Sequence, residues 1–386
     1  MSYATRTNHL KPEGAYQVLA RANQLETEGR EIIHLEIGQP DYATFENVSE
    51  AGIEAIRAGH TRYTPPAGMP SLREAIARDS GQRRGIKIEA NEVVISPGGK
   101  PNLFFPTLAV VEPGDEVIYP NPGFPTYEAM IILAGGIPKA VPLLEESNFS
   151  FDLGAFDRLI SKRTKLIILN SPSNPTGGVI PGTDLEHIAK KAQEFNCWVM
   201  SDEIYARLSY DGLKVSSIAS LPGMKERTII VDGFSKTYSM TGWRLGYGIM
   251  PPELANRVDL LLTHSIGSTA HFTQFAGLEA ITGPQDMVEV MVAEYQRRRD
   301  VIVEGLNQIS GFICQKPQGA FYAFPNIKGT GMKSDELANL ILEKAGVALL
   351  PGSSFGEYGE GYLRISYANS IENIRKAMQK IKSVVG

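Results

Sequence analysis

Five short apolar runs recur between residues 91 and 236, and a polar or glycine-rich cluster follows each of them. Helical patterns separate the runs, which are expected as strands at Val93–Ser96, Glu116–Tyr119, Lys165–Leu169, Cys197–Met200 and Thr228–Val231. Strands that alternate with helices predict an α/β fold with a mostly parallel sheet. Because the carboxyl ends of parallel strands share one edge of the sheet, we expect the clusters to meet around one ligand.

The clusters contain residue types that bind charged ligands. They are Pro97–Lys100, Pro120–Phe124, Asn170–Gly177, Ser201–Glu203 and Asp232–Lys236. Gly98 and Gly99 precede an expected helix, so the backbone N–H groups at its start are placed to bind a phosphate. A nucleotide-binding P-loop is excluded, because Pro101 follows Lys100 where that loop requires Ser or Thr.

Lys236 has the most specific surroundings in these clusters. It follows Ser235, and Arg244 lies eight positions further on. A lysine with a hydroxyl and an arginine nearby suits a carbonyl cofactor that carries a phosphate: the amine forms a Schiff base while Ser235 and Arg244 hold the phosphate. A solvent-exposed loop lysine is the alternative, and it would be favoured for a lysine without this spacing.

Length and composition narrow the class of protein. The 386 residues predict two domains with enough apolar surface to bury. A net charge of −5 gives no basic excess to attract nucleic acid, and no segment has the apolar length that a membrane span requires. Cys197 and Cys314 are too few and too far apart for a disulfide framework or a zinc site. We therefore expect a cytoplasmic protein that binds small molecules, not nucleic acid or a membrane.

The segment Asp232–Tyr247 resembles the lysine segment of the class I/II aminotransferases, which have fold type I and bind pyridoxal 5'-phosphate. Six motifs similar to those of the family, in particular of bacterial aspartate aminotransferases, occur in the same order between about Ile32 and Tyr367. The resemblance implies a large α/β domain at 45–290, with a mostly parallel sheet flanked by helices. It also implies a smaller α+β domain built from both chain ends, 1–44 and 291–386.

The resemblance assigns roles around the cofactor. Lys236 would carry it covalently and move a proton during catalysis. The ring withdraws electrons only while its pyridine nitrogen is protonated, which requires a buried carboxylate, and Asp202 matches the family's aspartate. Asn174 and Tyr205 would donate hydrogen bonds to the phenolic oxygen of the ring. Phe124 would stack on the ring, where many family members have tryptophan or tyrosine; a core phenylalanine is the alternative.

Other residues are assigned to the substrate and to a second subunit. Arg364 matches the arginine that binds the substrate α-carboxylate, a group that a planar guanidinium binds with two hydrogen bonds. Gly38 resembles the residue whose backbone meets that carboxylate, and Asn174 would also contact the substrate. Tyr63, in the loop before an expected helix at Ser71–Ser80, resembles the tyrosine that reaches the cofactor phosphate of the neighbouring subunit. The resemblance therefore implies a homodimer with shared active sites.

The implied activity is amino transfer (EC 2.6.1.-) between an L-amino acid, such as aspartate, and a 2-oxo acid, such as 2-oxoglutarate. Lys100 leaves two interpretations open: it binds the distal carboxylate of a dicarboxylic donor, or it only neutralises the cofactor phosphate. A carbon–sulfur β-lyase of the same fold is an alternative, because Lys236, Asp202 and Arg364 serve both reactions. The alternative from another class is a non-catalytic pyridoxal-phosphate sensor, which would need a fused DNA-binding segment.

Overall fold

A mixed sheet forms the centre of the computed structural model, which describes residues 3–8, 10 and 12–385. Within these residues the sheet has eight strands in the order β2-β9-β8-β7-β6-β3-β4-β5. The strands are β2 (Val93–Ser96), β3 (Glu116–Asn121), β4 (Ile137–Leu144), β5 (Ser150–Phe151), β6 (Thr164–Asn170), β7 (Trp198–Asp202), β8 (Thr228–Gly233) and β9 (Gly246–Ile249). The five strands expected from the sequence are all present, and the predicted α/β fold is confirmed.

The direction of the strands determines where their ends lie. Neighbours from β8 through β4 are parallel, whereas β9 is antiparallel to both β2 and β8. β2 therefore runs in the same direction as the parallel strands β8 to β4, although it pairs with β9 and with none of them. The residues that follow β2, β3, β6, β7 and β8 consequently emerge at one edge of the sheet.

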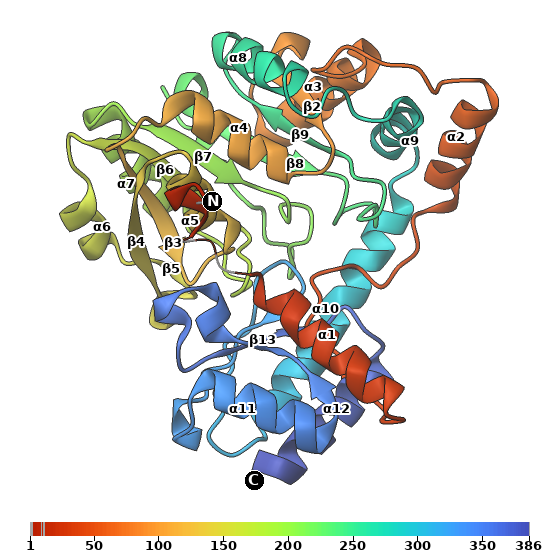
Figure 1. Cartoon of the computed structure of the whole chain (residues 1–386), viewed down its shortest axis with the longest axis vertical. Helices are drawn as coiled ribbons and strands as arrows, with labels where there is room; N and C mark the ends of the chain where they lie inside the picture. Colours follow the sequence, from red (N-terminus) through yellow and green to blue (C-terminus); the bar gives the residue numbers. More distant parts are fainter. Residues whose placement is uncertain (1–2, 9, 11, 386) are drawn as a thin grey trace.

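Helices cover both faces of this sheet (Figure 1). They are α2 (Glu46–Arg57), α3 (Pro70–Arg84), α4 (Lys100–Val110), α5 (Thr126–Leu133), α6 (Leu153–Leu159), α7 (Gly182–Glu194), α8 (Pro252–Thr263) and α9 (His271–Thr282). Side chains of β6 alternate between two cores: Ile168 packs in the core with α4, α5 and α8, and Ile167 in the core with α6 and α7. Burial on both faces explains why the strands are almost continuously apolar.

Both ends of the chain form a second group of elements. They are α1 (Gly14–Thr27), β1 (Ile33–His34), α10 (Asp286–Leu306), β10 (Tyr322–Ala323), α11 (Ser334–Leu340), β11 (Val347–Ala348), β12 (Leu350–Pro351), β13 (Leu363–Ser366) and α12 (Ile371–Val385). β1 pairs in parallel with β11, and β13 pairs antiparallel to both β10 and β12. Figure 1 shows α10 running from the level of α9 down to the C-terminal elements. The division into domains at 45–290 and at 1–44 with 291–386 stays a prediction.

One helix is longer than the sequence pattern indicated. The expected helix at Ser71–Ser80 continues in α3 to Arg84 and ends at Gly85, whose φ of 67° is left-handed. Glycine adopts this conformation without the steric cost of a Cβ atom, which makes it a favourable helix end. The extra turn carries Arg83 and Arg84 to the sheet, where both contact buried carboxylates.

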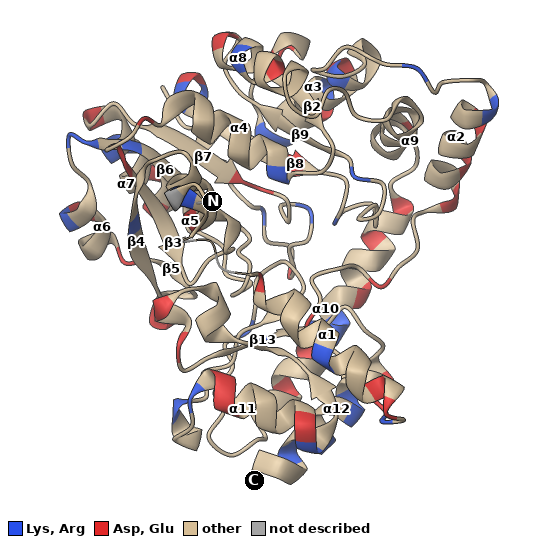
Figure 2. Cartoon of the chain, viewed as in Figure 1, with Lys and Arg blue, Asp and Glu red and all other residues tan. Residues whose placement is uncertain are grey.

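Charged residues of both signs are distributed over the outer helices (Figure 2). Among the described residues, no helix combines the length and the apolar character that crossing a membrane requires.

Candidate active site

A cavity of about 1370 Å³ borders the carboxyl edge of the large sheet. The strand ends and the second group of elements together supply its walls. Sequence-predicted site residues that line it are Gly38, Gly99, Lys100, Phe124, Asn174, Asp202, Tyr205, Ser235, Lys236, Arg244 and Arg364. Eleven residues from across the chain thus meet at one cavity, as the parallel topology predicts.

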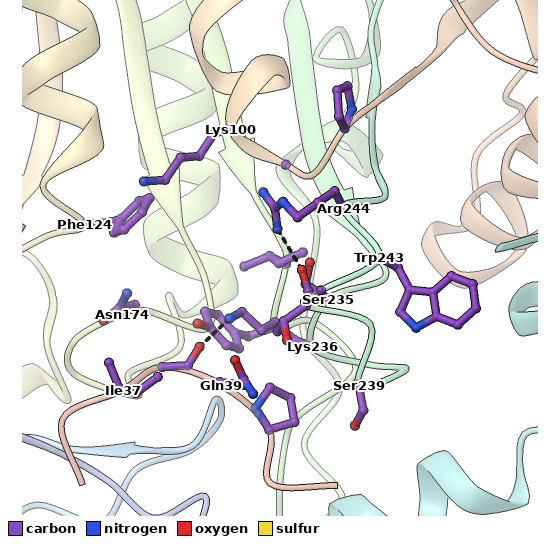
Figure 3. A pocket seen from close by; sticks show the side chains of 18 of the residues that line it. Ile37, Gln39, Lys100, Phe124, Asn174, Ser235, Lys236, Ser239, Trp243 and Arg244 are labelled. Atoms are coloured by element: carbon purple, nitrogen blue, oxygen red, sulfur yellow. Dashed lines mark hydrogen bonds between the residues drawn. The ribbon is translucent and has the colours of Figure 1, made fainter. Parts of the chain in front are cut away.

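Lys236 follows β8 and points into this cavity (Figure 3). Its Nζ donates a hydrogen bond of 2.5 Å to the carbonyl of Gly38. Burial, together with the positive charges of Arg364 and Arg244, lowers the pKa of Lys236 to about 8, whereas Asp202 opposes the shift. An amine with this pKa is partly unprotonated near neutral pH, which is the form that attacks a carbonyl group or accepts a proton.

Asp202 ends β7 and is buried. The Tyr127 hydroxyl donates a hydrogen bond of 2.7 Å to its Oδ2, and the Ile204 N–H donates one of 3.3 Å to Oδ1. Burial raises the pKa of Asp202 to about 6; these two hydrogen bonds oppose the rise, and the charges of Asp232 and Glu203 add to it. A cationic group of a ligand beside Asp202 would favour the ionised carboxylate.

Arg84 neutralises the two carboxylates behind Asp202. Its guanidinium donates to Glu203 at 2.8 Å and to Asp232 at 3.2 Å, and the Tyr247 hydroxyl donates to Asp232 at 3.1 Å. The Arg84 side chain is only 4% exposed, so these ion pairs are shielded from water. Of the three carboxylates of Asp202, Glu203 and Asp232, that of Asp202 is the one that lines the cavity.

Arg364 lies in β13, a strand of the second group of elements, and lines the cavity from there. Nη1 donates to Asn174 Oδ1 at 3.3 Å, and Nη2 donates to the carbonyl of Glu36. The guanidinium centre lies 4.6 Å from the centre of the Tyr322 ring. Its Nε is buried and has no hydrogen-bond partner among the described residues. Buried donors are normally satisfied, so a free Nε on an arginine that lines a cavity fits an anionic ligand group.

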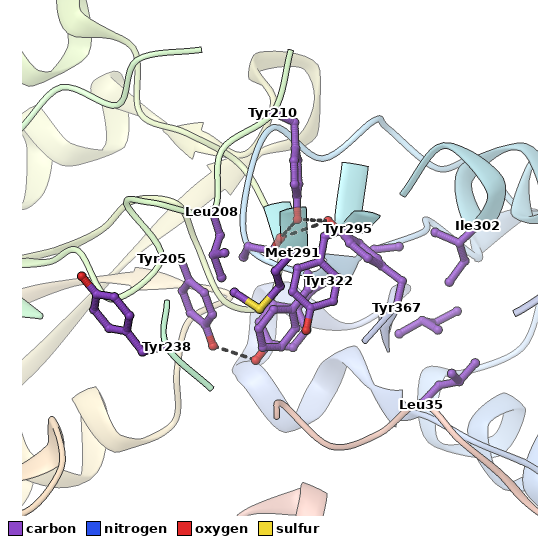
Figure 4. Close-up of a cluster of buried hydrophobic side chains, with 14 of the residues drawn as sticks. Leu35, Tyr205, Leu208, Tyr210, Tyr238, Met291, Tyr295, Ile302, Tyr322 and Tyr367 are labelled. Carbon is purple, nitrogen blue, oxygen red and sulfur yellow. Dashed lines mark hydrogen bonds between the residues drawn. The ribbon is translucent and has the colours of Figure 1, made fainter. Parts of the chain in front are cut away.

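Hydrogen bonds of Tyr205, Tyr322 and Asn170 hold this wall in place. The hydroxyls of Tyr205 and Tyr322 share a hydrogen bond of 2.7 Å (Figure 4). Asn170, at the end of β6, accepts a hydrogen bond of 2.8 Å from the backbone N–H of Asn174, and its own amide donates to the Asp202 carbonyl at 3.1 Å. No separate pattern in the sequence pointed to Tyr322.

A second anion site lies at the start of α4. Gly98 has a φ of 83°, and a Cβ atom there would lie only 2.3 Å from Arg244 Nη2. Glycine therefore lets the backbone approach the guanidinium closely. Arg244 and Ser235 lie together on one side of the cavity (Figure 3). Backbone N–H groups of a helix start, a guanidinium and a hydroxyl form a donor set that suits a phosphate.

Lys100 points away from this donor set, toward the ring of Phe124 (Figure 3). Its Nζ lies 5.3 Å from the ring centre and forms an ion pair with Glu13. Phe124 packs edge-on against Tyr127, with 5.7 Å between the ring centres. Tyr63 is 98% exposed and is not among the residues that line this cavity.

Sequence reasoning missed four contributors to the site. Tyr127 lies three positions after Phe124, just beyond the second of the strand-end clusters, so its position was a usable signal. Asn170 was part of a cluster but was assigned no role. Arg84 and Tyr322 carry no local pattern that separates them from an ordinary helix arginine or core tyrosine.

The strand order and the cavity at the sheet edge define the class of protein: the chain is a fold-type-I transferase. Comparison with known proteins identifies the family within this class. The family model described as aminotransferase class I and II matches residues 30–381, and the chain belongs to this family.

Individual relatives agree with this assignment. The chain is 38% identical to an aspartate aminotransferase of Geobacillus stearothermophilus, over 99% of this chain and 98% of that protein. It is 40% identical to an aromatic-amino-acid aminotransferase of Thermococcus litoralis, over 92% of each. The solved structure of an aspartate aminotransferase from Thermus thermophilus with maleate superimposes with a TM-score of 0.95 at 37% identity, over 100% of both chains. These comparisons support an aminotransferase and give no support to the lyase or the sensor.

Members of this family depend on pyridoxal phosphate. The residues of this chain fit that cofactor. Lys236 supplies an amine with a lowered pKa, and Asp202 supplies a buried carboxylate. The backbone at Gly98 lies close to the guanidinium of Arg244 at the start of α4, and these donors suit a phosphate.

Proposed function

We propose that this aminotransferase accepts L-aspartate or L-glutamate, together with some neutral amino acids, and uses a 2-oxo acid such as 2-oxoglutarate as the amino acceptor. The observation that carries the proposal is that Lys236, Asp202 and Arg364 line one cavity from three different elements. Lysine supplies the base, aspartate the counter-charge and arginine the carboxylate site, which are the three functions that amino transfer requires.

When bound, pyridoxal phosphate supplies an electron sink for the carbanion character that develops at the substrate Cα. Asp202 would hold the proton on the pyridine nitrogen, and the hydrogen bond from Tyr127 orients its carboxylate. Asn174 and Tyr205 would donate to the phenolic oxygen of the ring. Arg244, Ser235 and the backbone N–H groups at Gly98–Gly99 would bind the phosphate. Phe124 would stack on the ring.

Arg364 binds the α-carboxylate of the amino acid. The Nε of Arg364 has no hydrogen-bond partner among the described residues and is available for this carboxylate. The hydrogen bond to Asn174 helps to hold the guanidinium over the ring of Tyr322. The substrate Cα is thereby held near Lys236. Because the pKa of Lys236 is lowered to about 8, its unprotonated amine can accept the Cα proton and would pass it to the C4′ carbon of the cofactor. The carbonyl of Gly38 positions the amine.

A homodimer completes this site in our proposal. Tyr63 is 98% exposed in the single chain, although tyrosine has a large apolar ring. An exposed tyrosine in an ordered loop fits a residue that reaches into a neighbouring subunit, where its hydroxyl would bind the cofactor phosphate. We propose the cytoplasm as the location of the protein.

The position of Lys100 favours a role in substrate recognition over a role at the phosphate. Its ammonium points toward Phe124 and away from Arg244 (Figure 3). A distal carboxylate of aspartate would meet a point charge there, which selects less sharply than the two parallel hydrogen bonds of an arginine. We therefore expect the protein to use both dicarboxylic and neutral amino donors.

Borohydride reduction tests the proposal. The reduced protein should carry the cofactor on the peptide that contains Lys236, and Lys236→Ala should lose turnover. A panel of amino donors should then show amino transfer to 2-oxoglutarate. Without an amino acceptor, these donors should not release pyruvate. Labelling of another lysine would refute the role of Lys236, and pyruvate release without an acceptor would favour the lyase.

A further inference from the structure

Glu13 occupies the side of the cavity where the distal part of a substrate would lie. It directly precedes α1 and forms an ion pair with Lys100 Nζ. Both residues line the same cavity. The side chain of Glu13 is 28% exposed and that of Lys100 is 50% exposed, so the pair lies at the cavity mouth, in contact with water.

The start of α1 is packed closely enough to hold Glu13 near Lys100. A Cβ atom added to Gly14 would lie 2.4 Å from Ser354 Oγ, which means that the backbone of α1 touches the segment Gly352–Phe355 at this point. The absence of a side chain at Gly14 leaves room for this approach. The packing holds the backbone that follows Glu13 against this segment, and the Glu13 side chain reaches Lys100 from there.

Two carboxylates cannot be neutralised fully by one ammonium group. If Lys100 binds the distal carboxylate of aspartate or glutamate, that carboxylate meets Glu13 beside the same positive charge. Like charges in a partly buried site repel, and the repulsion weakens binding of the dicarboxylic ligand. A ligand with a neutral side chain creates no such conflict, because the Glu13–Lys100 pair then stays intact.

Apolar residues elsewhere in this cavity favour neutral side chains as well. Tyr16 and Leu19 of α1 and Ile37 after β1 line the same cavity. They offer a surface on which an aliphatic or aromatic substrate side chain can bury apolar area while Glu13 keeps Lys100 neutralised.

We propose that Glu13 is a specificity-determining residue: its carboxylate occupies Lys100 when the donor has a neutral side chain and rotates away when a dicarboxylic donor binds. The inference rests on the proposed function, since it assumes that substrates enter this cavity. It adds a reason why one site accepts both kinds of donor. Glu13 lowers affinity for dicarboxylic ligands and thereby limits the preference for them.

The test compares two unreactive ligands of the cofactor-loaded protein, maleate as the dicarboxylate and 3-phenylpropionate as the monocarboxylate. Glu13→Gln keeps the side-chain shape and removes the charge. Since a partly exposed ion pair is worth up to about 1 kcal/mol, the dissociation constant of maleate, measured by calorimetry, should fall about fivefold. That of 3-phenylpropionate should change by less than about twofold. Glu28→Gln, at the other end of α1, is the matched control and should change neither.

Lys100→Ala in the Glu13→Gln background separates the two partners. The gain in maleate affinity should disappear in the double variant, because no ammonium remains for the second carboxylate. The gain in Glu13→Gln should also shrink as ionic strength rises, since exposed charges are screened within a distance of about 10 Å at 0.1 M salt. Unchanged maleate binding in Glu13→Gln, or equal changes for both ligands, would overturn the proposal.

This binding experiment does not depend on turnover. If the protein binds both ligands and Glu13→Gln shifts their ratio, the inference holds even when the donor panel shows no amino transfer. If amino transfer is observed but the ratio does not shift, the proposed function holds and the role of Glu13 is wrong.

Discussion

Replacing Asp202 with asparagine should stabilise the cofactor-free protein while it removes the charge on which the chemistry depends. Burial raises the pKa of Asp202 from 3.8 to about 6. This difference corresponds to about 3 kcal/mol that the ionised carboxylate costs the folded protein. Asparagine has the same shape, and its one oxygen can still accept the hydrogen bond from Tyr127. The longer bond of 3.3 Å from the Ile204 N–H is lost, because the NH2 group then faces this donor. We expect most of the cost to be relieved.

The stabilisation should depend on pH. Because the folded-state pKa lies above the unfolded value, the stability linked to Asp202 is fully present below pH 3.8 and is lost as pH rises through about 6. The advantage of Asp202→Asn should therefore be about 3 kcal/mol at pH 8, about half of that at pH 5, and absent in stronger acid. With pyridoxal phosphate bound, the wild-type carboxylate gains a cationic partner, so Asp202→Asn should lose its advantage in stability. The turnover of the variant should be about a hundredfold lower than that of the wild type.

Urea unfolding of the cofactor-free proteins at pH 5 and pH 8 measures this difference directly. Asp286→Asn, at an exposed position at the start of α10, is the control and should change the free energy of unfolding by no more than about 0.5 kcal/mol. Our account of Asp202 would be refuted if Asp202→Asn were less stable than the wild type at pH 8, or if its gain were the same at both pH values. Near-normal turnover of the loaded variant would remove Asp202 from its proposed role.

Two further predictions concern burial and assembly. Arg84→Ala leaves the buried carboxylate of Glu203 without its ion-pair partner, while Asp232 keeps Arg83 and Tyr247, and should destabilise the protein by about 3 kcal/mol. Arg78→Ala at an exposed position of the same helix should not; equal melting temperatures would contradict the buried network. Mixing inactive Lys236→Ala protomers with weakly active Tyr63→Phe protomers should restore part of the activity in hybrid dimers, measured as amino transfer, if Tyr63 serves the neighbouring site. An active monomer at high dilution would contradict the shared site.

The sequence predicted the fold because its information was local. Each expected strand is an apolar run bounded by turn residues, and each is present in the large sheet. The alternation of strands with helices required parallel strands, so the convergence of Asn174, Asp202 and Lys236 at one edge followed from topology alone. Gly98 and Tyr63 are the predicted residues that do not line the cavity: Gly98 lies against Arg244, and the proposed partner of Tyr63 lies outside the single chain.

Contacts between distant parts of the chain were decided only by the tertiary structure. Arg84 and Glu203 are 119 positions apart, and Glu13 and Lys100 are 87 positions apart. In sequence each of these residues has the pattern of an ordinary charged side chain on a helix or loop. Their importance depends on how closely their elements pack and on how much water is excluded, because burial strengthens the interaction of charges and shifts the pKa of the groups involved. The sequence by itself therefore determined which residues meet at the sheet edge, while packing decided their charge states and the partners that hold them.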